Sequence, residues 1–267
     1  MVTYQKISKF MLNELLVEAN RINKKVKNKI KYFNKSTNSR VNPVTKYDKQ
    51  IELRLIKLLK KKFPQHKIFG EEFGKSGPKS IYEWIIDPID GTKALICGQP
   101  TWSNLIGFSR SKKPILGLAN YPVMKKYYFT DGLKSFCFDK KKIKIKTSSI
   151  KTIKNSKLII NSIHTLVSSK MFKFLKNYKY FFKISGSDSY NFCLLAEGKI
   201  DIVMEYGLKP YDYLPVIPII ENSGGIITDW QGKRDFKNGD IIASANKTLH
   251  SDFLRLINKK NLNFRKR

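Results

Sequence analysis

Apolar residues recur at spacings of mostly three and four along the first part of the chain, from Ile7 to Ile30. This is the period of a helix with one buried face, so we predict an amphipathic helix that ends near Asn34 and packs on a sheet. A second pattern of the same period covers residues 48–62. It predicts a helix that ends at Phe63-Pro64, because proline cannot continue a helix.

Short runs rich in β-branched and aromatic residues follow the second helix. Residues 67–69 and 81–86 are predicted strands, and the second of them delivers Asp87 at its carboxyl end. Three further runs are separated by turn residues and predict an antiparallel meander. These runs are 102–109, 115–121 and 125–130.

The second half of the chain alternates strand-like and helix-like patterns, which is typical of an α/β layer. The predicted strands are 157–161, 180–185, 200–205 and 225–230, and the predicted helices are 170–176, 189–197, 215–223 and 249–258. The lysine- and serine-rich stretch 139–154 has little periodicity and predicts a link between two parts. We therefore expect an α/β (α+β) layered sandwich of helix and sheet layers, divided into subdomains 1–147 and 148–267.

Charge raises the question of a polyanionic partner. The chain has 52 basic and 21 acidic side chains, a formal net charge of +31, and such a surface attracts nucleic acid. The basic residues are spread from Lys6 to Arg267 and are mostly lysine, which favours a bias in composition with solvated side chains. A basic RNA-binding protein on the same fold is kept as the alternative from another functional class.

Cysteine spacing and hydropathy bear on the cellular compartment and on a membrane partner. Cys97, Cys137 and Cys193 form no CxxC pair, so neither a disulfide framework nor a zinc site is indicated, and we expect a cytoplasmic protein. No run approaches the roughly 18 apolar residues of a membrane span, so no membrane partner is expected.

Acidic residues gather in one part of this basic chain. Five of the 21 fall between Glu71 and Asp90, in partly apolar surroundings where unpaired carboxylates repel one another and resist burial. A cation is therefore expected to hold them. Carboxylate oxygens are hard ligands suited to Mg²⁺, which often bridges to a substrate phosphate. The cluster predicts a magnesium-dependent phosphatase.

The string Asp87-Pro-Ile-Asp-Gly-Thr92 concentrates this chemistry. A hydrophobic strand runs into Asp87 and Pro88 fixes a turn, so that Asp87, Asp90 and the Ile89 carbonyl can face the same ions. The backbone N–H groups of Gly91 and Thr92 open the next segment, where a helix start could receive phosphate oxygens. An isolated Asp-x-x-Asp would more often be a surface turn, but the complete string is more specific.

Three motifs resemble those of the inositol monophosphatase-like, magnesium-dependent phosphatases, and the resemblance covers nearly the whole chain. They are Gly70-Glu71-Glu72, the string from Asp87 to Thr92, and Tyr211-Asp212, which stands where the family has Trp-Asp. The resemblance implies the fold of that family, two or three Mg²⁺ ions and a homodimer. The metal ligands that it implies are Glu71, Asp87, the Ile89 carbonyl, Asp90 and Asp212.

The same resemblance implies metal-assisted hydrolysis of a small phosphate monoester. Asp48 and Thr92 would form a pair that orients the attacking water, with Glu71 sharing the role of base. Taken from the residues alone, Asp48 is also explained as a charge at a helix N-terminus.

Two departures from the family pattern look like its histidinol-phosphatase branch: the stretch 93–102 and Lys209-Pro-Tyr-Asp-Tyr213. Histidinol phosphate carries an ammonium and a partly protonated imidazole, with which Asp188 and Glu205 could pair. Alternatively, Asp188 caps a helix and Glu205 ends a strand. Histidinol phosphate is the predicted substrate; inositol 1-phosphate and other sugar or nucleotide phosphates are the alternatives. The predicted substrate-binding residues are Asp90, Gly91, Thr92, Ser187, Asp188, Glu205 and Asp212.

Overall fold

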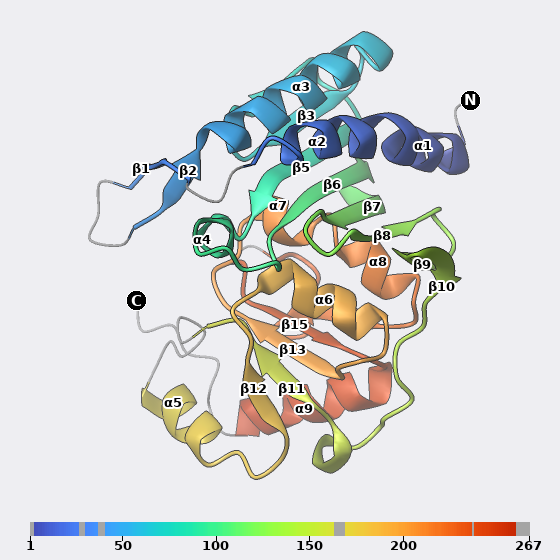
Figure 1. Cartoon of the computed structure of the whole chain (residues 1–267). Coiled ribbons are helices and arrows are strands. Elements are labelled where there is room, and N and C mark those ends of the chain that lie inside the picture. Colours follow the sequence, from blue (N-terminus) through green and yellow to red (C-terminus); the bar gives the residue numbers. More distant parts are fainter. Residues whose placement is uncertain (1–2, 27–29, 37–40, 163–168, 237, 260–267) are drawn as a thin grey trace. The chain divides into compact units, whose positions relative to one another are not determined.

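The computed structural model describes residues 3–26, 30–36, 41–162, 169–236 and 238–259 (Figure 1). The chain divides into two compact units. Unit 1 comprises residues 1–143 and 211–219, and unit 2 comprises 144–210 and 220–267. We predicted a single boundary after residue 147 with Asp212 in the C-terminal part. Here Asp212 lies in unit 1, because the short segment 211–219 returns to it.

Unit 1 begins with α1 (Tyr4–Phe10) and α2 (Leu16–Asn23), joined by a π-helical turn. The helix predicted to reach Asn34 therefore ends at Asn23, and that prediction was wrong. Further along, the chain forms β1 (Tyr32–Asn34), which pairs with β2 (Pro43–Thr45). The apolar spacing continues past Asn23, but pairing with a distant strand decides the backbone conformation.

The second helix, α3 (Lys46–Lys62), begins and ends close to the predicted bounds. Thr45 caps its N-terminus, and Asp48 completes a capping box with it. Three lysines in the last turn complement the negative end of the helix dipole. Figure 1 shows α2 lying beside α3, and α3 packs on the sheet against β5 (Tyr82–Asp90).

The sheet of unit 1 has eight strands in the order β10-β9-β8-β7-β6-β5-β3-β4. The meander was predicted correctly: β5, β6, β7, β8 and β9 pair antiparallel in turn, while β3 and β5 are parallel. The short strands β4, β9 and β10 were not predicted. The bounds are β3 Lys67–Gly70, β4 Gly74–Ser76, β6 Ser103–Arg110, β7 Lys113–Tyr121, β8 Lys126–Thr130, β9 Ser135–Asp139 and β10 Lys141–Lys144.

The core of unit 1 lies between this sheet and the helices. Trp84 is completely buried at its centre, and its ring packs against those of Phe10, Phe63 and Phe108. Its indole N–H donates to His66 Nδ1 at 3.1 Å. Because Trp84 stands on β5, the strand that carries Asp87 is anchored by a large and completely buried side chain.

Unit 2 contains a five-stranded sheet in the order β12-β11-β13-β15-β14, with β15 antiparallel to both of its neighbours. Figure 1 shows α6 and α9 on opposite faces of this sheet. The predicted alternation is largely present, but β15 and α7 were missed. The bounds are β11 Leu158–Ile160, α5 Ser169–Lys176, β12 Phe182–Ile184, α6 Asp188–Ala196, β13 Ile202–Glu205, α7 Pro210–Tyr213, α8 Ile217–Glu221, β14 Ile226–Asp229, β15 Ile241–Ser244 and α9 Lys247–Lys259. Within the described ranges, no helix is long and apolar enough to span a bilayer.

Candidate metal centre

The candidate site contains a group of three aspartates, Asp87, Asp90 and Asp212, and the first two of them come from the end of β5. The strand does not stop before Asp87 as predicted but continues to Asp90, with a bulge where Asp87 pairs with Leu105 and Asp90 with Ser103. The bulge places an extra residue between the two aspartates. Pro88 therefore stands inside a bulged strand, and the turn predicted there is absent.

Asp212, on α7 in the segment that returns to unit 1, completes the group. Among the described residues, Asp87, Asp90 and Asp212 each offer one carboxylate oxygen, and these oxygens lie within 4.8 Å of one another. Burial raises the pKa of Asp87 well above its usual value, and repulsion from Glu71, Asp90 and Asp212 adds to the shift. Asp87 Oδ1 is buried without a hydrogen-bond partner.

This arrangement fits a divalent cation. Three carboxylates that meet at one point, two of them buried, repel each other unless a positive charge lies between them. All three donors are oxygens, as Mg²⁺ prefers, and the partnerless Asp87 oxygen offers a lone pair for it.

Glu71 stands outside this group. Its Oε1 lies 3.0 Å from Lys35 Nζ, which also contacts Glu72 Oε1 at 2.6 Å. Burial lowers the pKa of Lys35, but the two glutamates outweigh it and the net pKa is above the usual value. Burial raises the pKa of Glu71, which also has Asp87 as a hydrogen-bonding neighbour. The carboxylate is therefore next to the group and is neutralised by a lysine.

A buried glutamate that the sequence reading missed holds the turn carrying Glu71. Glu52, on α3, accepts the backbone N–H of Glu72 at 2.8 Å and that of Phe73 at 2.9 Å. Gly70 leaves room for it, because a Cβ there would lie 1.9 Å from Glu52 Oε1. Burial raises the pKa of Glu52 to about 7. The sequence signal that could have found Glu52 is its position four residues after Asp48, which places both carboxylates on the same face of α3.

Asp48 and Thr92 lie together as expected. Thr92 Oγ1 is 3.3 Å from Asp48 Oδ1 and 3.1 Å from the Ile89 carbonyl oxygen, and its single hydrogen can go to either. Asp48 Oδ2 accepts the backbone N–H of Thr45 at 2.8 Å and its hydroxyl at 2.5 Å. Burial raises the pKa of Asp48 to about 6. The helix-start role considered for Asp48 is thus present together with the contact to Thr92.

Of the remaining predicted site residues, one belongs to unit 1 and three belong to unit 2. Gly91 has a left-handed backbone (φ 81°) and precedes the short α4 (Thr92–Ile96). Ser187, Asp188 and Glu205 belong to unit 2. Asp188 is the first residue of α6 and Ser187 is its N-cap residue, so Asp188 is not the cap; Glu205 ends β13 and is buried.

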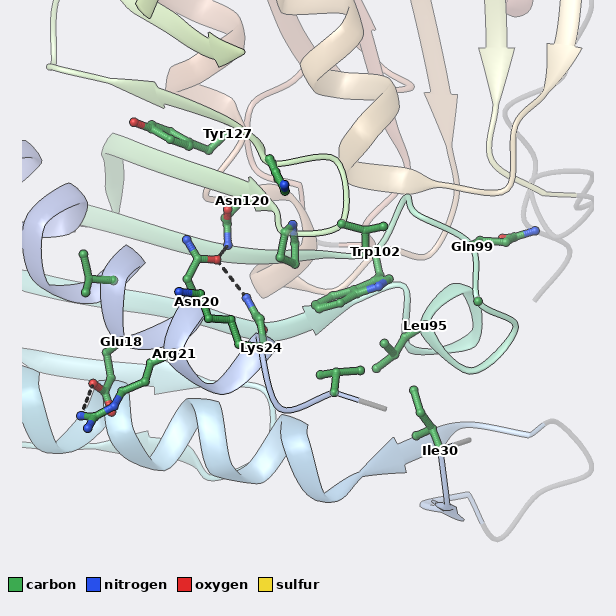
Figure 2. Close-up of a pocket in the computed structure, with 17 residues that line it drawn as sticks. Glu18, Asn20, Arg21, Lys24, Ile30, Leu95, Gln99, Trp102, Asn120 and Tyr127 are labelled. Carbon is green, nitrogen blue, oxygen red and sulfur yellow. Dashed lines mark hydrogen bonds and ion pairs between the residues drawn. The ribbon is translucent and has the colours of Figure 1, made fainter. Parts of the chain in front are cut away.

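A separate cavity of about 1010 Å³ opens in unit 1. Figure 2 shows Trp102, Leu95 and Ile30 on its wall, with Asn20 and Asn120 joined by a hydrogen bond at one side. None of the predicted site residues lines it. No local sequence pattern indicates this cavity, because its lining comes from α2, α4, β7 and β8 together.

Comparison with known proteins gives a consistent result. A family profile described as "Inositol monophosphatase family" matches residues 5–262. The bifunctional phosphatase IMPL2 of Arabidopsis thaliana is 37% identical over 212 residues, covering 76% of this chain and 60% of that protein. This chain thus spans less than two thirds of that relative.

Two other curated relatives are matched over most of their length. A fructose-1,6-bisphosphatase/inositol-1-monophosphatase of Aquifex aeolicus is 32% identical, covering 81% of this chain and 82% of that protein. A histidinol-phosphatase of Chlorobaculum parvum is 26% identical, covering 80% and 83%.

Among solved structures, an inositol monophosphatase from Zymomonas mobilis superposes with a TM-score of 0.78 at 27% identity, covering 97% of this chain and all of that one. This likeness confirms the predicted fold class.

Proposed function

Because this chain belongs to the inositol monophosphatase family, we propose that it hydrolyses the monophosphate ester of a small polyol or sugar, with inositol 1-phosphate as the first candidate. The chain is a metal-dependent phosphoric monoester hydrolase. The observation that carries the proposal is the meeting of Asp87, Asp90 and Asp212 carboxylate oxygens within 4.8 Å. Support for the substrate comes from the relatives named for inositol phosphates.

The predicted ligands have distinct parts in this proposal. Asp87, Asp90 and Asp212 would hold Mg²⁺, and Glu71 and the Ile89 carbonyl would complete the set once Lys35 and Thr92 release them. Bound Mg²⁺ lowers the pKa of a coordinated water and neutralises phosphate charge.

Asp48 and Thr92 orient the attacking water. When Thr92 Oγ1 donates its hydrogen to Asp48 Oδ1, the oxygen lone pairs of Thr92 are left to accept a hydrogen bond from water. Thr92 cannot act as a base by itself near neutral pH, but the Asp48 carboxylate is within reach to accept its proton. The pKa of about 6 leaves Asp48 mostly ionised at pH 7 to 8.

Histidinol phosphate is the second candidate. It is favoured by the similarity to a histidinol-phosphatase, and Asp188 and the buried Glu205 stay the residues predicted from the sequence to pair with the cationic groups of that substrate. A polyol has no cation for them to pair with.

A comparison of kcat/KM on inositol 1-phosphate, fructose 1,6-bisphosphate and histidinol phosphate tests both candidates. We expect the polyol or sugar phosphate to be preferred, with all activity lost on chelation and in Asp87→Asn. A preference of more than about 10-fold for histidinol phosphate, which is about 1.4 kcal/mol in transition-state binding, would overturn the first candidate in favour of the second. Absence of magnesium-dependent hydrolysis of any of the three would overturn both.

The ion count and the oligomeric state stay predictions. Two or three Mg²⁺ ions for each chain are expected in calorimetric titration with a non-hydrolysable phosphate present. A homodimer is expected in analytical ultracentrifugation.

A further inference from the structure

Four asparagine side chains form a connected network in unit 1, outside the group of acids. Asn104 on β6 and Asn120 on β7 stand directly opposite each other in the sheet, and Asn20 and Asn23 project from α2. Asn104 Oδ1 accepts from Asn23 Nδ2 and from Asn120 Nδ2, each at 2.8 Å. Asn20 Oδ1 accepts from Asn120 Nδ2 at 2.9 Å and from Asn23 Nδ2 at 3.3 Å. Figure 2 shows the contact between Asn20 and Asn120 beside the cavity.

The network ends on the bulge that carries two of the acids. Asn104 Nδ2 donates to the Pro88 carbonyl oxygen at 2.6 Å. The paired residues are Asp87 with Leu105 and Asp90 with Ser103, so Asn104 is the residue opposite the bulge. A bulge interrupts the ladder, and proline has no N–H to give, so this part of β5 lacks regular pairing. The Asn104 amide supplies a donor that the ladder does not.

The direction of the Asn104 amide is fixed by its neighbours. Its oxygen faces two N–H donors, from Asn23 and Asn120, so a rotated amide would place its own NH₂ against them. The correct orientation therefore leaves its NH₂ for Pro88. Asn23 uses both amide hydrogens in this network while its Oδ1 is buried without a partner. A buried oxygen without a hydrogen-bond partner lowers the stability of the fold. Local rules of this kind are broken most often near functional sites.

We infer that Asn104 is a positioning residue that clamps the bulge of β5 so that Asp87 and Asp90 face one cation, with Asn120 and Asn23 orienting its amide. Asp87 and Asp90 are buried like charges, and in the absence of a clamp repulsion would favour a bulge that lets them separate. The inference rests on the proposed function, in which these two aspartates hold Mg²⁺. Asn104 is not one of the residues proposed to bind the ion or the substrate.

The test measures Mg²⁺ binding directly, by calorimetric titration of full-length protein with MgCl₂ and no phosphate ester. Asn104→Leu keeps the number and branching of the side-chain heavy atoms and removes the donor. We expect Mg²⁺ affinity to fall by about 10-fold, as for other residues that orient metal ligands. In the activity assay, kcat at saturating Mg²⁺ and KM for the ester should change by less than about 3-fold. Asn104→Ser, which retains a hydroxyl donor, should recover part of the affinity.

Ser8→Ala is the matched control. Ser8 is also buried and donates to a backbone carbonyl of the same sheet, that of Thr130, at 2.9 Å. A merely structural role for Asn104 predicts that both variants lower the melting temperature and both keep the wild-type Mg²⁺ affinity, and that result would overturn the inference. If Asn104→Leu does not fold, Asn104→Ala takes its place, with the same expected and contrary results.

The titration separates this inference from the substrate proposal. A wild-type protein that binds Mg²⁺ but hydrolyses none of the tested esters would refute the proposed substrates and leave the clamp to be judged by the affinities of the Asn104 variants. A wild-type protein that does not bind Mg²⁺ would refute both.

Discussion

Replacing Gly70 by alanine tests how the turn that carries Glu71 is held. The new Cβ would lie 1.9 Å from Glu52 Oε1 and 2.4 Å from its Cδ, distances that no structure tolerates. Glu52 is completely buried, so its carboxylate cannot swing into solvent. The carboxylate must therefore move away from the backbone N–H groups of Glu72 and Phe73, from which it accepts hydrogen bonds.

The magnitude follows from these two hydrogen bonds. A hydrogen bond to a charged group contributes about 1.5 to 3 kcal/mol, so losing both should lower the free energy of unfolding by about 3 kcal/mol or more. Gly74→Ala is the matched control four residues along. Its left-handed backbone (φ 66°) costs about 1 kcal/mol with a side chain, and nothing lies within 4 Å of the added Cβ.

Urea denaturation at pH 8, followed by tryptophan fluorescence, would measure both effects. Glu52 is mostly ionised there, because burial raises its pKa only to about 7. A double-mutant cycle with Glu52→Ala isolates the clash. In that background Gly70→Ala should cost less than about 1 kcal/mol, since the obstructing carboxylate is gone. An equal cost in both backgrounds would refute the reasoning.

Substitutions of Asp87, Thr92 and His250 offer three further tests. Asp87→Asn replaces a carboxyl group whose ionised form is disfavoured by burial and by the neighbouring acids, so the melting temperature of the metal-free protein should rise by about 2–4 °C at a pH where that carboxyl would otherwise ionise. The stabilisation by Mg²⁺ and the hydrolysis should disappear, and an unchanged response to Mg²⁺ would contradict the site. Thr92→Val should lower kcat by about 100-fold and keep the Mg²⁺ affinity measured by calorimetry, whereas a parallel loss of affinity would show that Thr92 supports the metal site instead. His250 is buried between hydroxyl groups, and burial lowers its pKa to about 4. Its neutral form therefore stabilises the fold fully above its ordinary pKa of 6.5, and this contribution is lost as the pH falls from 6.5 to about 4. His250→Gln should flatten the melting temperature over that range, and a wild-type slope in the variant would assign the pH dependence to other groups.

Much of the fold was open to sequence reasoning because it depends on local patterns. The helix α3 was predicted within two residues, since its apolar period, its start at Thr45 and its end before Pro64 are all written in neighbouring residues. The first helix was predicted eleven residues too long, to Asn34 and not Asn23. Its apolar spacing persists, but β1 is held by pairing with β2, a contact that no local pattern records.

The candidate site likewise contains residues that local patterns indicate and residues that they do not. The residue types of the acidic strings pointed to oxygen ligands for a divalent cation, and three of the five predicted ligands, Asp87, Asp90 and Asp212, meet in one group. Glu52 and Asn104 were missed. Neither belongs to a recognisable string, because each acts by reaching a backbone group brought near only by folding.

By itself, the sequence determined the chemistry of this protein: which oxygens are available, where strands and helices alternate, and which family of phosphatases it belongs to. Only the tertiary structure decided the geometry. It placed Asp212 in the same unit as Asp87, put a bulge in β5 where a turn was expected, and joined α2 to that bulge through asparagines. The physical reason is that residue identity and spacing set local conformation and chemical type, whereas the direction of a buried carboxylate depends on hydrogen bonds between segments far apart in the chain.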